Sequence, residues 1–326
     1  MSKASLLSRR ALLAAAASGA ACGAMGLRSS VTHAAAPMLG ASRPSVYRFK
    51  LGDFEIAQIL DGFVQGNGPH PIFGNNQPAE VVQAYAAANR LPPTRWENSF
   101  TNTVVNTGKE LVLFDTGNGA GRAPTTGKLV GLLDSAGIKP EQIDVVVITH
   151  GHPDHIGGLM SAEKPTFPNA RYVFGEVEFD FWRKGEGLPE ARKANREMFM
   201  KVAAPFGEKA RFLKSEGEVV SGIRAIEAFG HSPGHMAYHI ESQGRRLLLW
   251  VDVTNHYVMS LQQPEWHVSF DHDKDMGVAT RKRILDMVAT DQIPAIGYHM
   301  PFPAVGYVEK TGASFRWVPV SYQLNL

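Results

Sequence analysis

The sequence predicts an α+β fold in which sheets pack together and helices cover the outside. Short runs of β-type residues recur in both halves of the chain, and only a few helical segments interrupt them. Of 326 residues, 44% are hydrophobic and 20% are charged, which is ordinary globular composition. This composition excludes a disordered tail, a collagen-like repeat and a polytopic membrane protein.

The expected strands are short apolar runs, taken in chain order: Phe54–Leu60, Thr103–Asn106, Leu111–Phe114, Val145–Thr149, Arg171–Phe174, Ile223–Ala228, Ala237–Glu241 and Leu247–Val251. The expected helices are Pro78–Ala88, Thr126–Ala136, Glu190–Ala204 and Lys274–Ala289. In the second helix three leucines fall on one face and Gly137 supplies a stop. The third helix is long and polar and breaks the rhythm of strands, so we interpret the stretch from Gly187 to Phe206 as an insertion that could cover a site.

The first 36 residues predict an export signal. Arg9 and Arg10 directly precede an apolar run that ends near Ala24, and small residues lead to an A-x-A cleavage site before Pro37. This pattern resembles a twin-arginine signal peptide, so residues 37–326 are expected to form the exported domain, in the periplasm or secreted. The run is shorter than the roughly 20 residues that span a bilayer. A lipid anchor at Cys22 is the alternative.

Charge and cysteine content exclude two further classes of function. The chain has 33 basic and 31 acidic residues, and its leader holds basic residues without any acidic one, so the remainder has no electrostatic footprint for nucleic acid. Membrane contact is expected only through export. Because Cys22 is the single cysteine, the exported domain has neither a disulfide nor a thiolate ligand.

The segment that follows the apolar run Val145–Thr149 carries four potential metal ligands in H-x-H-x-D-H order. They are His150, His152, Asp154 and His155. Imidazole nitrogen and carboxylate oxygen suit zinc-like divalent ions, and four such groups exceed the need of one open catalytic site. The first two histidines can project together from an extended turn, whereas Asp154 and His155 come as the chain bends into a helix and face a second position.

Three further candidates each follow an apolar run. His231 comes after Ile226–Gly230, Asp252 after Leu247–Val251, and His299 after Ile293–Tyr298. Burying a carboxylate without a partner is costly, which favours a bound cation beside Asp252 over the alternative of a helix cap.

These seven residues together resemble the dinuclear ligand set of the metallo-β-lactamase-fold hydrolases. The resemblance extends over the exported domain and includes Leu113–Gly117, whose Asp115 matches a structural aspartate that supports the metal loop. It implies a four-layer αββα sandwich with the metals at one edge. It also implies that His150, His152 and His231 hold one metal, that Asp154, His155 and His299 hold the other, and that Asp252 bridges them.

Within that superfamily, the sequence is most similar to the methyl parathion hydrolase and lactonase branch. The sequence segments that carry this similarity are Asn102–Asn106, His231–His235, Glu241–Gly244 and Phe315–Val320. A histidine at position 152 argues against a flavodiiron protein, and Asp252 argues against a true zinc β-lactamase. No candidate for the helical substrate domain of glyoxalase II is evident.

The resemblance implies an exported hydrolase of lactones or related esters, with phosphotriester cleavage as a side activity. Two divalent ions, zinc first and manganese, cobalt or iron(II) as alternatives, would share a water and present it as hydroxide. Asp154 is expected to receive and pass on the proton, and Asp252 to serve both metals. The alternatives are a β-lactam hydrolase and a metal-binding or signal-binding protein without catalysis. Both monomer and homodimer remain open.

Other residues carry weaker signals. His235 could orient a ligand or stabilise its turn, and surface or strand positions are expected for His239, His256, His267 and His272. An aromatic cluster beside the insertion could be a pocket wall or core packing: Phe179, Phe181 and Trp182. Tyr257 and Tyr298 lie near candidate ligands, but the sequence identifies neither as an oxyanion donor.

Overall fold

The computed structural model describes residues 38, 40–120, 122, 124–320 and 324–326. The expected signal peptide and Cys22 lie outside the described residues. All described helices and strands fall within one compact unit, Arg43–Leu326. None of the helices in the described part of the chain has the length and apolarity needed to cross a membrane.

The first sheet contains seven strands, in the order β1-β2-β3-β4-β5-β8-β9. Their bounds are β1 Val46–Leu51, β2 Phe54–Asn67, β3 Arg95–Asn106, β4 Leu111–Phe114, β5 Val145–Ile148, β8 Arg171–Gly175 and β9 Arg211–Leu213. The strands from β1 to β4 pair antiparallel, and those from β4 to β9 pair parallel. The parallel half therefore directs the carboxyl ends of β4, β5 and β8 towards the same edge.

The second sheet also has seven strands, paired in chain order. Their bounds are β10 Gly217–Val220, β11 Ile223–Glu227, β12 Met236–Ser242, β13 Arg245–Val251, β14 Ala295–Gly297, β15 Val305–Thr311 and β16 Ser314–Pro319. Every neighbouring pair is antiparallel except β13 and β14. A small separate ladder joins β6 (Met160–Ser161) to β7 (Lys164–Pro165).

Alternation along the strands explains how the two sheets pack. In β5, Val145 and Val147 join a central apolar cluster, whereas Val146 and Ile148 join a second cluster on the opposite face. Strand β13 divides in the same way, and its central residues meet those of the first sheet. Because both faces of these strands are apolar, each sheet needs a second covering layer.

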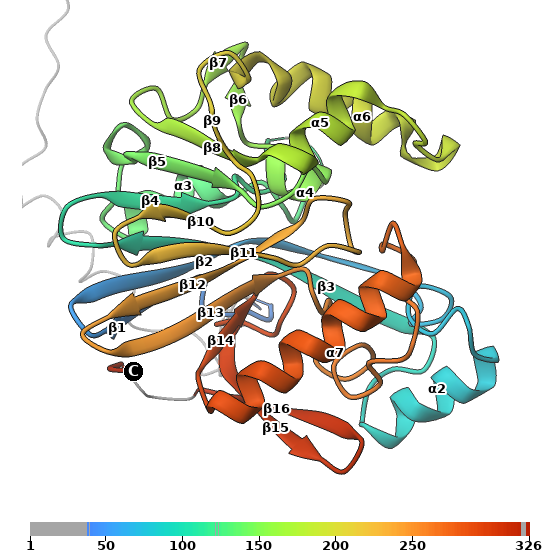
Figure 1. Ribbon diagram of the computed structural model, residues 1–326. Helices are drawn as coiled ribbons and strands as arrows, with labels where there is room; N and C mark the ends of the chain where they lie inside the picture. The colour runs from blue at the N-terminus through green and yellow to red at the C-terminus, as the bar shows by residue number, and fades with distance from the viewer. Residues whose placement is uncertain (1–37, 39, 121, 123, 321–323) are drawn as a thin grey trace, which may run out of the picture. The chain divides into compact units, whose positions relative to one another are not determined.

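Helices supply that layer on both outer faces (Figure 1). The first sheet is covered by α3 (Leu129–Ser135), α5 (Glu176–Lys184) and α6 (Lys193–Val202), and the second by α7 (Lys274–Asp291). The remaining helical segments are α2 Ala79–Ala88, α4 Pro153–Ile156 and the 3₁₀ turns η1 Pro140–Gln142, η2 Glu190–Arg192 and η3 Ala204–Phe206. The α+β prediction and the αββα layering are confirmed.

Two expected helices are shorter than the sequence suggested. Thr126–Ala136 was wrong at its start, because Gly127 has a φ of 74° and the helix begins at Leu129, whose backbone N–H donates to Asp61. Glu190–Ala204 is not one helix: η2 precedes α6, which ends at Val202. Pro205 restricts the residue before it and ends the regular helix.

Several elements were not anticipated. Helix α5 was missed because its charged and apolar residues alternate along the chain, a pattern more typical of a half-buried strand. The strands that were also missed are β1, β6, β7, β9, β10, β14, β15 and β16. Of these, β14 matters most for the site, because its end directs His299 into it.

Candidate metal centre

The H-x-H-x-D-H segment begins where buried β5 ends. His150 and His152 follow the strand, His152 has extended backbone, and Pro153 occupies the first position of α4, where its missing N–H costs nothing. Asp154 and His155 then lie in the single turn of α4. Between the first two histidines, a Cβ on Gly151 would lie 2.4 Å from Trp182, so only glycine allows this close packing.

The three downstream candidates also follow strand ends. His231 lies in the turn between β11 and β12, and His299 comes two residues after β14. Asp252 follows β13 directly, after Val251 turns the backbone with a φ of 56°. Strands from both sheets therefore bring all seven candidates to one edge of the sandwich.

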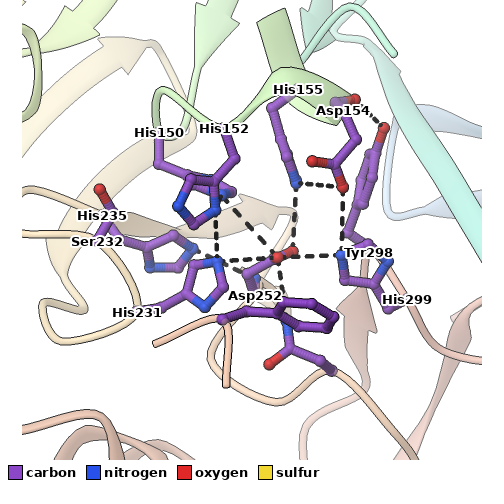
Figure 2. Close-up of polar contacts among 12 residues, drawn as sticks. His150, His152, Asp154, His155, His231, Ser232, His235, Asp252, Tyr298 and His299 are labelled. Carbon is purple, nitrogen blue, oxygen red and sulfur yellow. Dashed lines mark hydrogen bonds and ion pairs between the residues drawn. The ribbon is translucent and has the colours of Figure 1, made fainter. Parts of the chain in front are cut away.

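The first group of side chains consists of three histidines (Figure 2). Nε2 of His150 and Nε2 of His231 each lie 3.0 Å from Nδ1 of His152. All three rings are buried. They form one of the groups in the structure whose ligand atoms could share a cation.

The second group consists of Asp154, His155 and His299. Oδ2 of Asp154 lies 3.5 Å from Nε2 of His155 and 3.6 Å from Nε2 of His299. The two histidines are buried, whereas 15% of the Asp154 side chain is exposed.

Asp252 lies between the two groups, as Figure 2 shows. Its Oδ2 is 3.2 Å from Nε2 of His231 and 3.0 Å from Nε2 of His299, and its Oδ1 is 3.5 Å from Nε2 of His155. The carboxylate thus contacts members of both groups, which is the position that a bridging ligand would need. It is not a helix cap.

Most of the imidazoles are oriented by a hydrogen bond at the outer ring nitrogen. His155 donates from Nδ1 to Asp115 at 2.7 Å, and His299 donates from Nδ1 to the carbonyl of Ser99 at 2.8 Å. Asp115 also accepts two hydrogen bonds from Thr149, at the end of β5. A proton on Nδ1 leaves the Nε2 lone pair facing the centre. The supporting position expected for Asp115 agrees with these contacts.

Sequence reasoning missed the partner of His231. Its Nδ1 donates to Asp271 at 2.9 Å, and the other oxygen of Asp271 accepts from Arg281 at 2.7 Å. Arg281 is completely buried and also donates to three backbone carbonyls. Asp271 stands 40 residues from His231 in the chain, and no local pattern links them.

Glu178 was also missed. Its Oε1 accepts from the Gly151 N–H at 2.7 Å, from Trp182 Nε1 at 2.6 Å and from the Ser232 hydroxyl at 2.5 Å. Its Oε2 accepts from the Gly234 N–H at 2.8 Å. This buried carboxylate therefore ties the turn of the first two histidines to the turn of His231.

The electrostatics of the centre separate two kinds of histidine. Burial, reinforced by neighbouring positive charges, lowers the pKa of His150 and His152 well below the ordinary value, so both are neutral. Burial also acts on His155, but the carboxylates around it outweigh that effect and raise its pKa. Burial would raise the pKa of Asp252, yet the adjacent histidines lower it and keep it ionised.

This donor set fits divalent cations. Nδ1 of His152 faces Nε2 of both His150 and His231. A single proton on Nδ1 can be donated to only one of these two nitrogens, so the three neighbouring imidazoles retain a lone pair that a cation can use. Within the described residues, the buried Nε2 of His155 and Oδ1 of Asp252 have no hydrogen-bond partner. Such buried ligand atoms without a protein partner are what a cation would satisfy. The clusters suggest a dinuclear metal site.

Other candidates have different roles. His235 accepts the Asp252 N–H at its Nε2 and donates to the Ala228 carbonyl, so it fixes the backbone of the central carboxylate. The Tyr298 hydroxyl donates to the backbone carbonyl of Asp154 at 2.7 Å, so its proton is already used in a hydrogen bond within the protein. His256 is buried beside a cavity instead of lying at an ordinary surface or strand position.

The expected insertion does approach the centre. Arg192, at the start of this segment, donates to the Phe270 carbonyl, and its charge contributes to the lowered pKa of His152. Phe179 and Trp182, however, are buried in the cluster under α5 and α6, so core packing is the correct reading for them.

The cavity beside the centre has a volume of about 590 Å³, and neither of those aromatic residues lines it. It adjoins the candidate ligands through His299. Its walls are largely apolar and come from segments far apart in sequence: Pro69, Leu91, Pro92, Trp96, Tyr257, Met259, Pro301 and Phe302. Arg43, Gln65, Arg95 and Glu97 provide its charged and amide-bearing lining.

Comparisons with known proteins agree with this geometry. A family model described as the metallo-beta-lactamase superfamily matches residues 99–250. An N-acyl homoserine lactonase of Bacillus thuringiensis is 24% identical over 167 residues, and one of Bacillus cereus is 22% identical over 165 residues. Each match covers 51% of this chain and 59% of the relative, so the chain spans little more than half the length of these curated proteins.

Solved structures match over more of the chain. AidC, a dizinc quorum-quenching lactonase solved with the product N-hexanoyl-L-homoserine, has a TM-score of 0.80 and 26% identity over 86% of this chain and 98% of its own. The hydrolase AbOPH has a TM-score of 0.79 and 24% identity over 87% of this chain and 100% of its own. At this identity, the likeness to AbOPH supports the fold and carries no argument about activity.

Proposed function

This chain carries a metallo-β-lactamase superfamily domain, and from that premise we propose that it is a metal-dependent hydrolase of lactones, with N-acyl homoserine lactones as the first substrates to test. The observation that carries the proposal is the convergence of two ligand groups on the Asp252 carboxylate. The lactonases among its relatives support the choice of lactones over β-lactams.

We assign the two groups to two divalent cations, zinc in the first instance. His150, His152 and His231 would hold one, Asp154, His155 and His299 the other, and Asp252 both. Imidazole and carboxylate ligands suit zinc, although manganese, cobalt and iron(II) accept the same donors. When bound, the cations would polarise the lactone carbonyl and lower the pKa of the attacking water.

The protein's own contribution is orientation and proton transfer. Asp115, Asp271 and the Ser99 carbonyl hold the rings so that their inner nitrogens need no rearrangement. The charges of His155 and His299 outweigh burial and lower the pKa of Asp154, which therefore stays ionised. Because Asp154 is partly exposed, we propose that its carboxylate accepts the proton of the attacking water and returns it to the leaving oxygen.

Substrate breadth follows from the cavity. Its volume and apolar walls would accept an alkyl or aryl group beside the lactone ring. The same space supports phosphotriester cleavage as a proposed side activity, since a five-coordinate arrangement at phosphorus needs room. We further propose export through the twin-arginine leader, which would place this activity in the periplasm or outside the cell.

The decisive experiment compares kcat/KM for an aliphatic lactone, an aryl lactone, an aryl phosphotriester and a β-lactam on one zinc-loaded preparation. We expect a lactone to be the best substrate. We also expect the Asp154→Asn variant, which loses a carboxylate ligand, to remain inactive even when added zinc restores its metal content. A preference of about tenfold for the β-lactam, equivalent to about 1.4 kcal/mol, would overturn the lactonase assignment. No turnover of any substrate would favour a metal-binding or signal-binding protein.

A further inference from the structure

His256 has an unusually well-defined protonation state. Its Nδ1 accepts the backbone N–H of Val258 at 3.0 Å and that of Met259 at 3.2 Å. A nitrogen that accepts two hydrogen bonds cannot carry the proton, so the proton of the neutral ring lies on Nε2. Burial lowers the pKa of His256 to about 4, and the ring therefore remains neutral near pH 7.

The surroundings of the ring leave Nε2 as its available group. Tyr257 stacks on the imidazole with ring centroids 5.0 Å apart and planes 12° apart, and Phe73 meets it edge-on at 5.3 Å. His256 lines the same cavity as His299. Among the described residues, none accepts a hydrogen bond from Nε2. This atom is also absent from the buried polar atoms without a partner, which means that it is accessible and not enclosed. Its N–H is thus open to the cavity.

We infer that His256 binds substrate by donating a hydrogen bond from Nε2 to a neutral carbonyl on the acyl chain, in particular an amide carbonyl. This inference rests on the proposed lactonase function and assigns a specificity-determining residue to the amide that N-acyl homoserine lactones carry. A fixed N–H in a cavity with mainly apolar walls favours a neutral acceptor that brings an alkyl chain with it. A ligand without an acceptor would leave this donor unsatisfied.

The neighbouring donors are less suited to this role. The Ser99 hydroxyl already donates to the Met300 carbonyl at 3.1 Å. Arg43 forms a two-pronged ion pair with Glu97, with contacts of 2.6 and 3.1 Å. Arg95 also lines the cavity, but it is an exposed cation. The hydroxyl of half-buried Tyr257 is a neutral competing donor, and it can be removed without disturbing the stacked ring.

The test combines two variants with two substrates. In His256→Asn, the side-chain oxygen can accept the same two backbone N–H bonds, but no donor remains at the Nε2 position. Tyr257→Phe is the matched control. Zinc-loaded proteins are assayed with N-hexanoyl homoserine lactone and with an alkyl lactone of matched length that lacks the amide.

We expect His256→Asn to lower kcat/KM about tenfold for the amide-bearing lactone and less than about threefold for the alkyl lactone. Tyr257→Phe should change neither by more than about threefold. An equal loss on both substrates, no loss on either, or a selective loss confined to Tyr257→Phe would overturn the inference.

Binding separates this inference from the proposed function. Titration calorimetry of N-hexanoyl homoserine lactone into metal-free protein measures affinity without turnover, and we expect a Kd about tenfold higher in His256→Asn. If the wild type hydrolyses no lactone but still shows this difference, the donor assignment holds and the lactonase proposal fails. If turnover is normal and both proteins bind equally, the donor assignment fails.

Discussion

Glu178 offers a direct way to test whether the two histidine turns are held by one buried side chain. In the Glu178→Gln variant an amide nitrogen replaces one carboxylate oxygen at almost the same volume. Keeping the amide oxygen at the Oε1 position preserves three hydrogen bonds but turns the NH₂ group towards the Gly234 N–H. If the amide is flipped, its NH₂ group faces the three donors at the Oε1 position instead, which are the Gly151 N–H, Trp182 Nε1 and the Ser232 hydroxyl.

The expected cost follows from those contacts. A hydrogen bond to a charged group contributes about 1.5 to 3 kcal/mol, and an unsatisfied buried donor costs about 1 to 3 kcal/mol. We therefore expect the free energy of unfolding of metal-free protein to fall by about 2 to 4 kcal/mol. Loosening the ligand turns should weaken zinc binding about 10-fold to 100-fold, as loss of a supporting contact typically does.

Urea unfolding measures the first quantity, and competition with a chelator of known affinity measures the second. Glu176→Gln is the matched control, because Glu176 lies on the same helix but is exposed. If Glu178→Gln stays within about 0.5 kcal/mol in stability and about threefold in zinc affinity of that control, the role of Glu178 is refuted.

Three further predictions concern metal content, pH and export. Wild-type protein purified without chelator should contain about two divalent metal ions per chain, and a metal content of one or less after zinc addition contradicts this. Asp252→Ala should deplete both metals, whereas His299→Ala should deplete one. Because the folded-state pKa of His256 is about 4, below the ordinary 6.5, unfolding takes up a proton between these values and stability falls as the pH drops. This contribution, about 1.4 kcal/mol per pH unit, should be absent from His256→Asn, as pH-dependent urea unfolding would reveal. Replacing Arg9 and Arg10 by lysine should trap precursor in the cytoplasm, and normal export of that variant, followed by immunoblotting of cell fractions, would exclude the twin-arginine route.

The candidate ligands could be identified from the sequence because they come after buried apolar runs, one run for the H-x-H-x-D-H segment and one each for His231, Asp252 and His299. A strand that ends at a sheet edge delivers the next polar residue to that edge, as Asp252 after β13 illustrates. Spacing alone could not reveal which side chains support the ligands. Glu178 contacts residues that lie 27 and 56 positions away, and its own segment gave no strong helical pattern. Such partners arise only from packing.

The position of the cavity could not be predicted for the same reason. For Phe179 and Trp182 the sequence left a pocket wall and core packing open, and the fold decides for core packing, because the parallel half of the first sheet needs an apolar cover that α5 provides. The actual walls come from loops whose proximity depends on both sheets, so a residue such as His256 gains its meaning only from the assembled fold.

The charge arrangement around His231 indicates that the fold itself orients this candidate ligand. Arg281 is buried, and its guanidinium would be costly there without a complete set of acceptors. Asp271 and three backbone carbonyls provide that set, and the second oxygen of Asp271 fixes the imidazole with Nε2 facing Asp252. Since the same contacts satisfy a buried cation and orient a ligand, loss of Asp271 should reduce both stability and zinc affinity. The candidate metal centre is therefore coupled to the core beneath α7 as well as to the loops that carry the candidate ligands.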